Sequence, residues 1–212
     1  DKSYLLYKFE NAMERELLSL DDYESTVLEG KTILSNYYDF YSDKLIKPLK
    51  LEYRFISNDL FLEEEGIEPV LLTGQIDKIE PIGEPINGVQ HIKVVDYKTS
   101  SPKTENDIRG LTKTSKGDIY RQLVFYKILG ECDNQFRPPL GASKYIIDQA
   151  EVDFLKKNNK DTFVKIALNI PDSDVIELKH KIIDVMKRVR NLEFNGSEDY
   201  PVCGECEFCK ME

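Results

Sequence analysis

The chain has 212 residues and a formal net charge of −10, with 29 lysines and arginines against 39 aspartates and glutamates. This length fits one domain of ordinary to large size, which buries about 70% of its unfolded surface and needs no disulfides to hold its core. Hydrophobic residues make up 41% and charged residues 32%, which excludes a membrane protein and an acidic disordered tail. The negative charge argues against a broad basic nucleic-acid-binding face, but not against a metal site built from carboxylates.

The sequence carries no targeting signal that we can identify. No apolar run approaches the roughly 20 residues that cross a bilayer, and no signal-peptide pattern opens the chain, so we expect no membrane partner. Three of the four cysteines lie within the last ten residues, unlike a secreted disulfide framework, and this favours a cytoplasmic location. The first residue is Asp1 and not Met, which indicates a piece of a longer protein.

Residues 1–50 are predicted to form a pair of helices. In the first helix apolar residues recur at a spacing of three and four, namely Leu5, Leu6, Phe9, Ala12, Met13 and Leu17. Asp21 or Asp22 can cap the second helix, which ends before Pro48. Its apolar side is rich in tyrosine, and we expect these rings to serve packing and not nucleotide binding.

From residue 51 the apolar pattern changes to the alternation of strands. It predicts strands over residues 51–55, 70–79 and 89–99, with a tight turn at Asn87 and Gly88. A polar loop over residues 100–118 precedes a helix over 119–129, strands near 142–149 and 163–170, and a final helix from residue 171. This order predicts an α+β (mixed α/β) fold with a central mixed sheet of about five strands flanked by helices.

Two aspartates and a lysine stand out on the central strands. Asp96 and Lys98 are two residues apart in one strand and share a face. A hairpin centred on the 87–88 turn would place Asp77 opposite Lys98 and diagonal to Asp96, on that same face. Carboxylates this close repel unless a cation such as Mg²⁺ or Mn²⁺ lies between them, while the lysine can orient a water or stabilise charge on phosphorus. An ordinary surface salt bridge gives the same Asp-x-Lys pattern.

The helix that follows adds polar residues on one face. Gln122 and Tyr126 are four residues apart, beside Arg121, and these side chains can hold a phosphodiester backbone or a base edge. The segment from Lys98 to Arg121 contains six basic and three acidic residues, in an otherwise acidic chain. A solvated charged loop accounts for that charge equally well.

In this order, residues 74–77 (GQID), 94–99 (VVDYKT) and 121–126 (RQLVFY) resemble the motifs of the PD-(D/E)XK nuclease superfamily. Within it they resemble the RecB-type branch, and most closely the C-terminal nuclease module of bacterial UvrD/Rep-like helicases. The resemblance implies an N-terminal helical pair (1–50), a PD-(D/E)XK nuclease core with a C-terminal helix (51–195) and a cysteine-containing tail (196–212).

The resemblance also implies roles for single residues. Asp77 and Asp96 would be ligands of Mg²⁺ or Mn²⁺ and, with Lys98, the catalytic residues. Gln122, Tyr126 and Arg121 would contact DNA. Glu52 lies where family members often carry a glutamate on the first core strand, and we treat it as a supporting residue.

The function implied is that of a metal-dependent deoxyribonuclease, an exonuclease more than an endonuclease. Its partners would be DNA and a helicase domain in the same polypeptide, acting in DNA repair or recombination. One alternative is a catalytically inactive DNA-binding accessory module of a helicase, and another is a stand-alone phage-type exonuclease. The presence of Asp77, Asp96 and Lys98 together favours an enzyme.

The family usually has a metal-binding histidine on a helix well before the first strand. The chain has only His91, which strand alternation turns away from Asp96, and His180, which we expect to be an ordinary surface residue. We therefore expect the family histidine to lie upstream of Asp1.

The C-terminal cysteines form a second candidate metal site. Cys203, Cys206 and Cys209 follow a C-x-x-C-x-x-C spacing that suits Zn²⁺ or an iron–sulfur cluster. Three thiolates are one ligand short. Cys132 is a candidate for the fourth, or a small apolar residue at a helix end. The resemblance implies a fourth cysteine upstream of the nuclease core.

Overall fold

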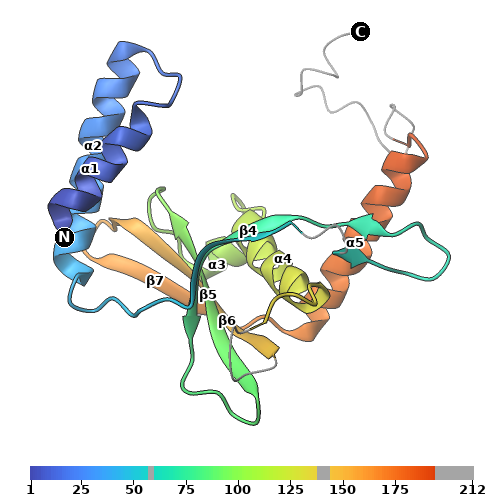
Figure 1. Cartoon of the computed structure of the whole chain (residues 1–212). Coiled ribbons are helices and arrows are strands. Elements are labelled where there is room, and N and C mark those ends of the chain that lie inside the picture. The colour runs from blue at the N-terminus through green and yellow to red at the C-terminus, as the bar shows by residue number, and fades with distance from the viewer. Residues whose placement is uncertain (57–59, 138–143, 194–212) are drawn as a thin grey trace, which may run out of the picture.

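The computed structural model describes residues 1–56, 60–137 and 144–193. A five-stranded sheet in the order β1-β4-β5-β6-β7 lies at the centre, as Figure 1 shows. Its strands are β1 (Lys50–Phe55), β4 (Gly74–Pro81), β5 (Val89–Lys98), β6 (Lys144–Lys157) and β7 (Phe163–Leu168). Only β5 and β6 run parallel, so the sheet is mixed, and the predicted fold class is confirmed.

Two helices build the core with the sheet. Helix α4 (Asp118–Cys132) packs against β4 and β6, and α5 (Asp172–Arg190) packs against α4. A separate two-stranded sheet pairs β2 (Phe61–Leu62) with β3 (Val70–Leu71). The strand predicted over 70–79 is two strands, β3 and β4, separated by Leu72 and Thr73. The backbone N–H of Leu72 donates a hydrogen bond to the carbonyl oxygen of Leu60, and the Thr73 hydroxyl donates to that of Phe55. Among the described residues, no helix is long and apolar enough to cross a bilayer.

The two N-terminal helices are present but contribute little to the core. Helices α1 (Lys2–Met13) and α2 (Leu20–Tyr41) lie side by side at one end of the molecule, as Figure 1 shows. Their contact is close, since a Cβ at Gly30 would clash with the ring of Phe9. Helix α1 ends four residues before Leu17, which is fully exposed, so the apolar spacing overestimated its length.

The hairpin between β4 and β5 differs from the prediction in register. The tight turn is present, with Ile86 bridging Val89 around Asn87 and Gly88, both at positive φ. Farther along, however, Lys78 lies opposite Val95. Two extra residues are absorbed on the β4 side near Gly83, which has φ +64°. The prediction that Asp77 faces Lys98 is therefore wrong, and the register extended by one residue places Asp77 opposite Asp96, on the predicted face.

The segment expected to be a loop contains a short helix, α3 (Glu105–Arg109). Thr104 and Asp107 form a capping box at its start, and Gly110 ends it with φ +77°. A Cβ at Gly110 would lie 2.7 Å from the backbone nitrogen of Gly117, so these two glycines close the loop at its neck. Helix α4 starts at the next residue, so the loop fixes its first turn.

Strand β6 continues eight residues beyond the predicted end at 149. Its second half carries two buried acids that a single sequence does not mark as strand residues. Glu151 pairs with Lys93 at 3.0 Å, and Asp153 pairs with Lys165 at 2.7 Å. These long-range partners allow charged residues to stand in a central strand.

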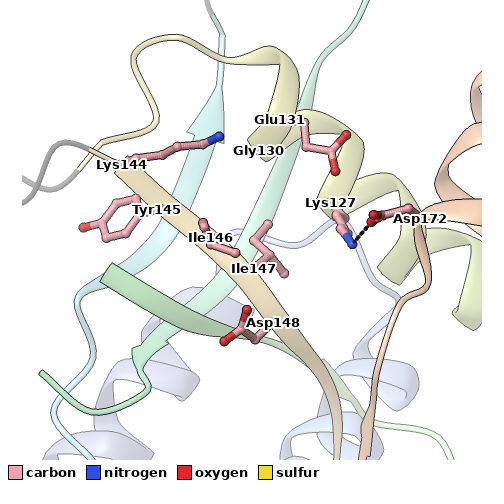
Figure 2. Close-up of a pocket in the computed structure, with 9 residues that line it drawn as sticks. All are labelled: Lys127, Gly130, Glu131, Lys144, Tyr145, Ile146, Ile147, Asp148 and Asp172. Atoms are coloured by element: carbon pink, nitrogen blue, oxygen red, sulfur yellow. Dashed lines mark hydrogen bonds and ion pairs between the residues drawn. The ribbon is translucent and has the colours of Figure 1, made fainter. Parts of the chain in front are cut away.

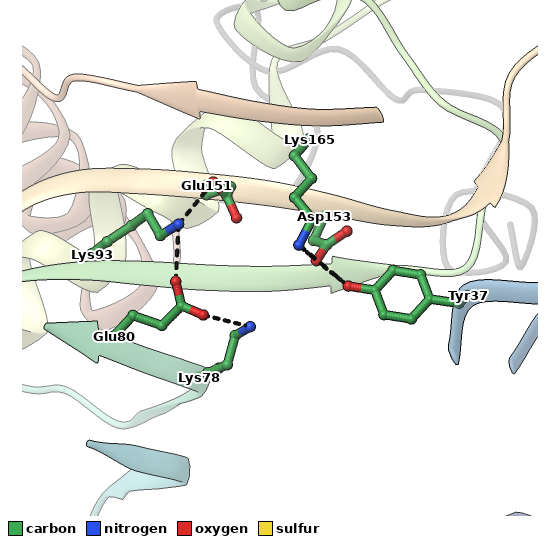
Figure 3. A network of polar contacts seen from close by, with 7 residues as sticks. All are labelled: Tyr37, Lys78, Glu80, Lys93, Glu151, Asp153 and Lys165. Carbon is green, nitrogen blue, oxygen red and sulfur yellow. Dashed lines mark hydrogen bonds and ion pairs between the residues drawn. The ribbon is translucent and has the colours of Figure 1, made fainter. Parts of the chain in front are cut away.

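The face of the sheet away from α4 carries a network of charged side chains, shown in Figure 3. Glu80 pairs with Lys78 at 2.8 Å and with Lys93 at 2.9 Å, and Lys93 reaches on to Glu151. Lys78 and Glu80 are only 5% and 4% exposed. This network joins β4, β5 and β6 through their side chains as well as their backbones.

The same face also holds the contact between α2 and the sheet. Tyr37 of α2 donates a hydrogen bond of 2.5 Å to Asp153, the acid that pairs with Lys165. Tyr37 is buried, and its ring packs edge-on against Phe163. The tyrosines of α2 thus serve packing, with Tyr37 anchoring the helix by its hydroxyl.

Candidate active site

Four of the predicted site residues form a closed ring between β5 and α4. Lys98 Nζ lies 2.8 Å from Asp96 Oδ2 and donates a 2.8 Å hydrogen bond to Gln122 Oε1. Gln122 Nε2 in turn donates to the Tyr126 hydroxyl at 2.7 Å. The Tyr126 hydroxyl donates to Asp96 Oδ1 at 2.9 Å, which closes the ring. Each side chain is therefore held by two others.

The packing of α4 makes this ring possible. Gln122 and Tyr126 share the face that looks onto Asp96, while Leu123 and Ile128 are fully buried and hold the helix to the core. Gly74 on β4 allows the helix to come close, since a Cβ there would lie 2.5 Å from the side chain of Leu129. The GQID segment thus contributes its glycine as well as its aspartate.

Burial sets the protonation of the ring. Asp96 is 2% exposed, and this burial raises the pKa of its carboxyl above the usual value, against the opposing contacts of Lys98 and Tyr126. The nearby charge of Asp77 acts in the same direction as burial. Burial and then Asp96 raise the pKa of Tyr126 far above neutral pH, so the hydroxyl keeps its proton and donates. The site therefore holds a carboxylate that gains from any additional cation.

Asp77 lies beside this ring on the neighbouring strand. Its Oδ2 accepts a 2.9 Å hydrogen bond from the backbone N–H of Tyr97. Directly opposed residues on antiparallel strands have Cβ atoms about 4.5–5.5 Å apart, so the carboxylates of Asp77 and Asp96 lie within reach of one cation. Two carboxylates fit a hard divalent ion whose other ligands are waters and a substrate phosphate. Among the residues that the structure describes, no third histidine, cysteine or acid joins them.

Other residues singled out in the sequence lie outside the ring. Arg121 donates to the backbone oxygen of Lys116 at 2.5 Å and pairs with Asp118, so it points away from Asp96. Glu52 has φ +48°, and its carboxylate accepts a hydrogen bond from Gln75. It follows that neither side chain contacts the carboxylate–lysine pair.

The histidines and cysteines do not contribute to this site either. His91 pairs with Asp148 at 2.7 Å, and its place in β5 turns it away from Asp96 as predicted, while His180 is exposed on α5. Cys132 is a free, half-buried cysteine at the end of α4. The predicted metal cysteines Cys203, Cys206 and Cys209 lie outside the described residues.

The assignment of Gln122 and Tyr126 to DNA contact stays a prediction. In the structure, which holds no DNA, Gln122 contacts Lys98 and Tyr126 contacts Asp96. The signal for these contacts was present in their i, i+4 spacing, which matches one helical turn above a strand, but only the packing of α4 shows which strand. Sequence reasoning missed the backbone N–H of Tyr97, which holds Asp77.

We expect Tyr126→Phe to lower the free energy of unfolding by about 1.5–3 kcal/mol, since the buried Asp96 carboxylate loses a hydrogen bond. The control is Tyr145→Phe, because within the described residues the buried Tyr145 hydroxyl has no partner. That change should leave stability equal or higher. Urea denaturation of both variants measures the difference, and equal losses would contradict the role given to the Tyr126 hydroxyl.

Comparison with known proteins supports the geometry. A family model described as the PD-(D/E)XK nuclease superfamily matches residues 6–211, nearly the whole chain. A comparison with curated proteins finds no match.

Proposed function

Because the chain belongs to the PD-(D/E)XK nuclease superfamily, we propose that it is a metal-dependent deoxyribonuclease with Asp77, Asp96 and Lys98 as its catalytic residues. The observation that carries this proposal is the convergence of three features on one face of the sheet. The first is the pair of carboxylates of Asp77 and Asp96, and the second is the Lys98 ammonium, which lies between Asp96 and Gln122. The third is the pair of α4 residues, of which Gln122 contacts Lys98 and Tyr126 contacts Asp96. An ordinary surface salt bridge needs none of this support.

The residues divide the work of phosphodiester hydrolysis between them. Asp77 and Asp96 would hold Mg²⁺ or Mn²⁺, the ions that members of this superfamily typically use. The bound ion would act as a Lewis acid and lower the pKa of a water molecule. Lys98 would place its ammonium group next to the reacting phosphate, where negative charge develops on the oxygens. Gln122 fixes the ammonium of Lys98, and Tyr126 fixes the Asp96 carboxylate.

We also propose the narrower assignment to the RecB-type branch, as an exonuclease attached to a helicase in DNA repair or recombination. The order of the motifs supports it, with GQID, DYK and Gln122-x-x-x-Tyr126 following one another along the chain. The cysteine spacing at 203, 206 and 209 supports a Zn²⁺ or iron–sulfur site in the tail. DNA and a helicase domain are the partners, and a cytoplasmic location follows from the same assignment.

Cleavage of linear and circular DNA by the 212-residue chain tests this proposal. We expect hydrolysis of linear single- or double-stranded DNA that rises with Mg²⁺ or Mn²⁺ and stops with chelator. Because an exonuclease needs an end, a circular single strand should remain intact under the same conditions.

Two outcomes would change the assignment. Binding of DNA without cleavage, at any concentration of Mg²⁺ or Mn²⁺, would identify an inactive DNA-binding accessory module. Cleavage of the circular strand at the rate of the linear one would contradict the exonuclease assignment and leave the nuclease assignment standing.

A further inference from the structure

A polar cavity lies at the same end of the sheet as the candidate active site. It has a volume of about 360 Å³ and lies between the chain leaving β5 and the turn that joins β6 to β7. Its lining consists of Ser101, Pro102, Lys157, Asn158, Asn159 and Lys160. None of these residues belongs to the ring around Asp96.

The position of this cavity relative to Lys98 follows from the backbone. Ser101 is three residues beyond Lys98, so their Cα atoms are at most about 11 Å apart. Lys98 lies opposite Phe154 on the parallel strand β6, and Lys157 comes three residues after Phe154 in the same direction. The cavity therefore adjoins the end of β5 that carries Asp96 and Lys98.

Apart from Pro102, the residues that line the cavity carry hydrogen-bond donors or cations, and none carries a carboxylate. This is unusual for a chain of net charge −10. The cavity between α4 and β6, shown in Figure 2, includes Glu131, Asp148 and Asp172. The cavity that borders Gln122 includes Asp118. A cavity with two lysines and no acid in its wall favours an anion.

The turn presents its donors in a fixed arrangement. Asn158 Oδ1 accepts hydrogen bonds from the backbone N–H groups of Lys160 and Thr162 and from the Thr162 hydroxyl, at 2.8–3.1 Å. All three contacts use the oxygen, and in the part of the chain that the structure describes no residue accepts a hydrogen bond from the two N–H donors of the Asn158 amide. Within the described residues Lys160 has no acidic partner, whereas Lys157 is paired with Asp161 at 2.9 Å.

We propose that this cavity is a phosphate-binding subsite that holds the nucleic-acid backbone next to the bond to be cut. The inference rests on the proposed nuclease function and extends it to a part of the substrate that the catalytic residues do not touch. Lys160 supplies the free charge, and the amides of Asn158 and Asn159 with the Ser101 hydroxyl supply neutral donors. Phosphate oxygens are the group that such a combination binds.

Binding of a fluorescent single-stranded oligonucleotide, measured by anisotropy in chelator, tests the subsite without cleavage. We expect Lys160→Ala to weaken binding by about three- to tenfold at low salt. The slope of log K against log salt should fall by about 1, since one phosphate contact is lost. The matched control is Lys144→Ala. Lys144 is exposed at the other end of β6, roughly 40 Å away along the strand, and should change neither quantity.

A series of oligonucleotides, each with one neutral methylphosphonate linkage, identifies the contact. One linkage position should weaken binding to the wild-type chain but have no effect on binding to Lys160→Ala. The neutral linkage and the substitution each remove the same contact between Lys160 and one phosphate. Additive losses at every position would overturn the subsite.

The remaining outcomes separate the subsite from the nuclease proposal. Unchanged binding by Lys160→Ala, or an equal loss for Lys144→Ala, would overturn the subsite while metal-dependent cleavage by the wild-type chain leaves the nuclease proposal intact. A wild-type chain that neither bound DNA in chelator at low salt nor cleaved it with Mg²⁺ or Mn²⁺ would overturn both.

Discussion

Replacing Asp96 by alanine should lower the rate of DNA cleavage at least about 10³-fold, the scale of losing a central group of a catalytic site. Asp96 is the residue on which the site converges, because Lys98 and Tyr126 contact its two carboxylate oxygens and Asp77 lies opposite. The measurement is single-turnover cleavage of linear DNA across a titration of Mg²⁺ and Mn²⁺.

The fold should survive this change. Burial already raises the pKa of Asp96, which means that burying the charged carboxylate costs free energy. Its removal also removes the repulsion between Asp96 and Asp77. Asp96→Asn is the matched variant, because it keeps an acceptor for Tyr126 while losing the charge. Both variants should unfold cooperatively in urea. Cleavage that persists in either one would point to a contaminating nuclease or to a different site.

The second large effect should be on stability. We expect Glu80→Gln to lower the free energy of unfolding by about 3–5 kcal/mol, because Lys78 would keep its charge at a nearly buried site without its acidic partner and Lys93 would keep only Glu151. The control is Glu105→Gln on α3, whose ion pair with Arg109 is largely exposed and should be worth less than about 1 kcal/mol. Urea denaturation at pH 7 measures both, and equal losses would contradict the role of burial.

The difference between wild type and Glu80→Gln should depend on pH. Burial opposes ionisation of Glu80, but the hydrogen bonds from Lys78 and Lys93 outweigh it and hold the pKa of Glu80 below its usual value. The stability contributed by this group is therefore complete above the unfolded pKa of about 4.3. It is lost as the pH falls through the lower, folded pKa. The two unfolding free energies should converge in acid and not at alkaline pH.

How much of this molecule the sequence predicts depends on how local each feature is. The shared face of Asp96 and Lys98 follows from strand alternation, and that of Gln122 and Tyr126 from helical spacing, so both could be predicted. The register of Asp77 could not, because two extra residues near Gly83 are absorbed inside a hairpin whose turn is otherwise as expected.

Other errors arose where distant partners override the local pattern. Strand β6 continues through Glu151 and Asp153 because Lys93 and Lys165 lie on neighbouring strands. Helix α3 is only five residues long, too short for apolar periodicity to show it, and its local signals were the capping box at Thr104 and the glycine at position 110.

The charged network on the face away from α4 has a consequence for which misfolded forms the chain can adopt. A slip of β4 by one residue would turn Lys78 and Glu80 toward the apolar side of α4 and would carry Asp77 to the opposite face from Asp96. The same register shift that separates Asp77 from Asp96 thus also buries two charged side chains among apolar ones. Molecules that reach a stable, compact state are accordingly molecules with an assembled site. A chain with apolar residues in place of this network would lose that link, and its preparations would mix active molecules with well-folded inactive ones.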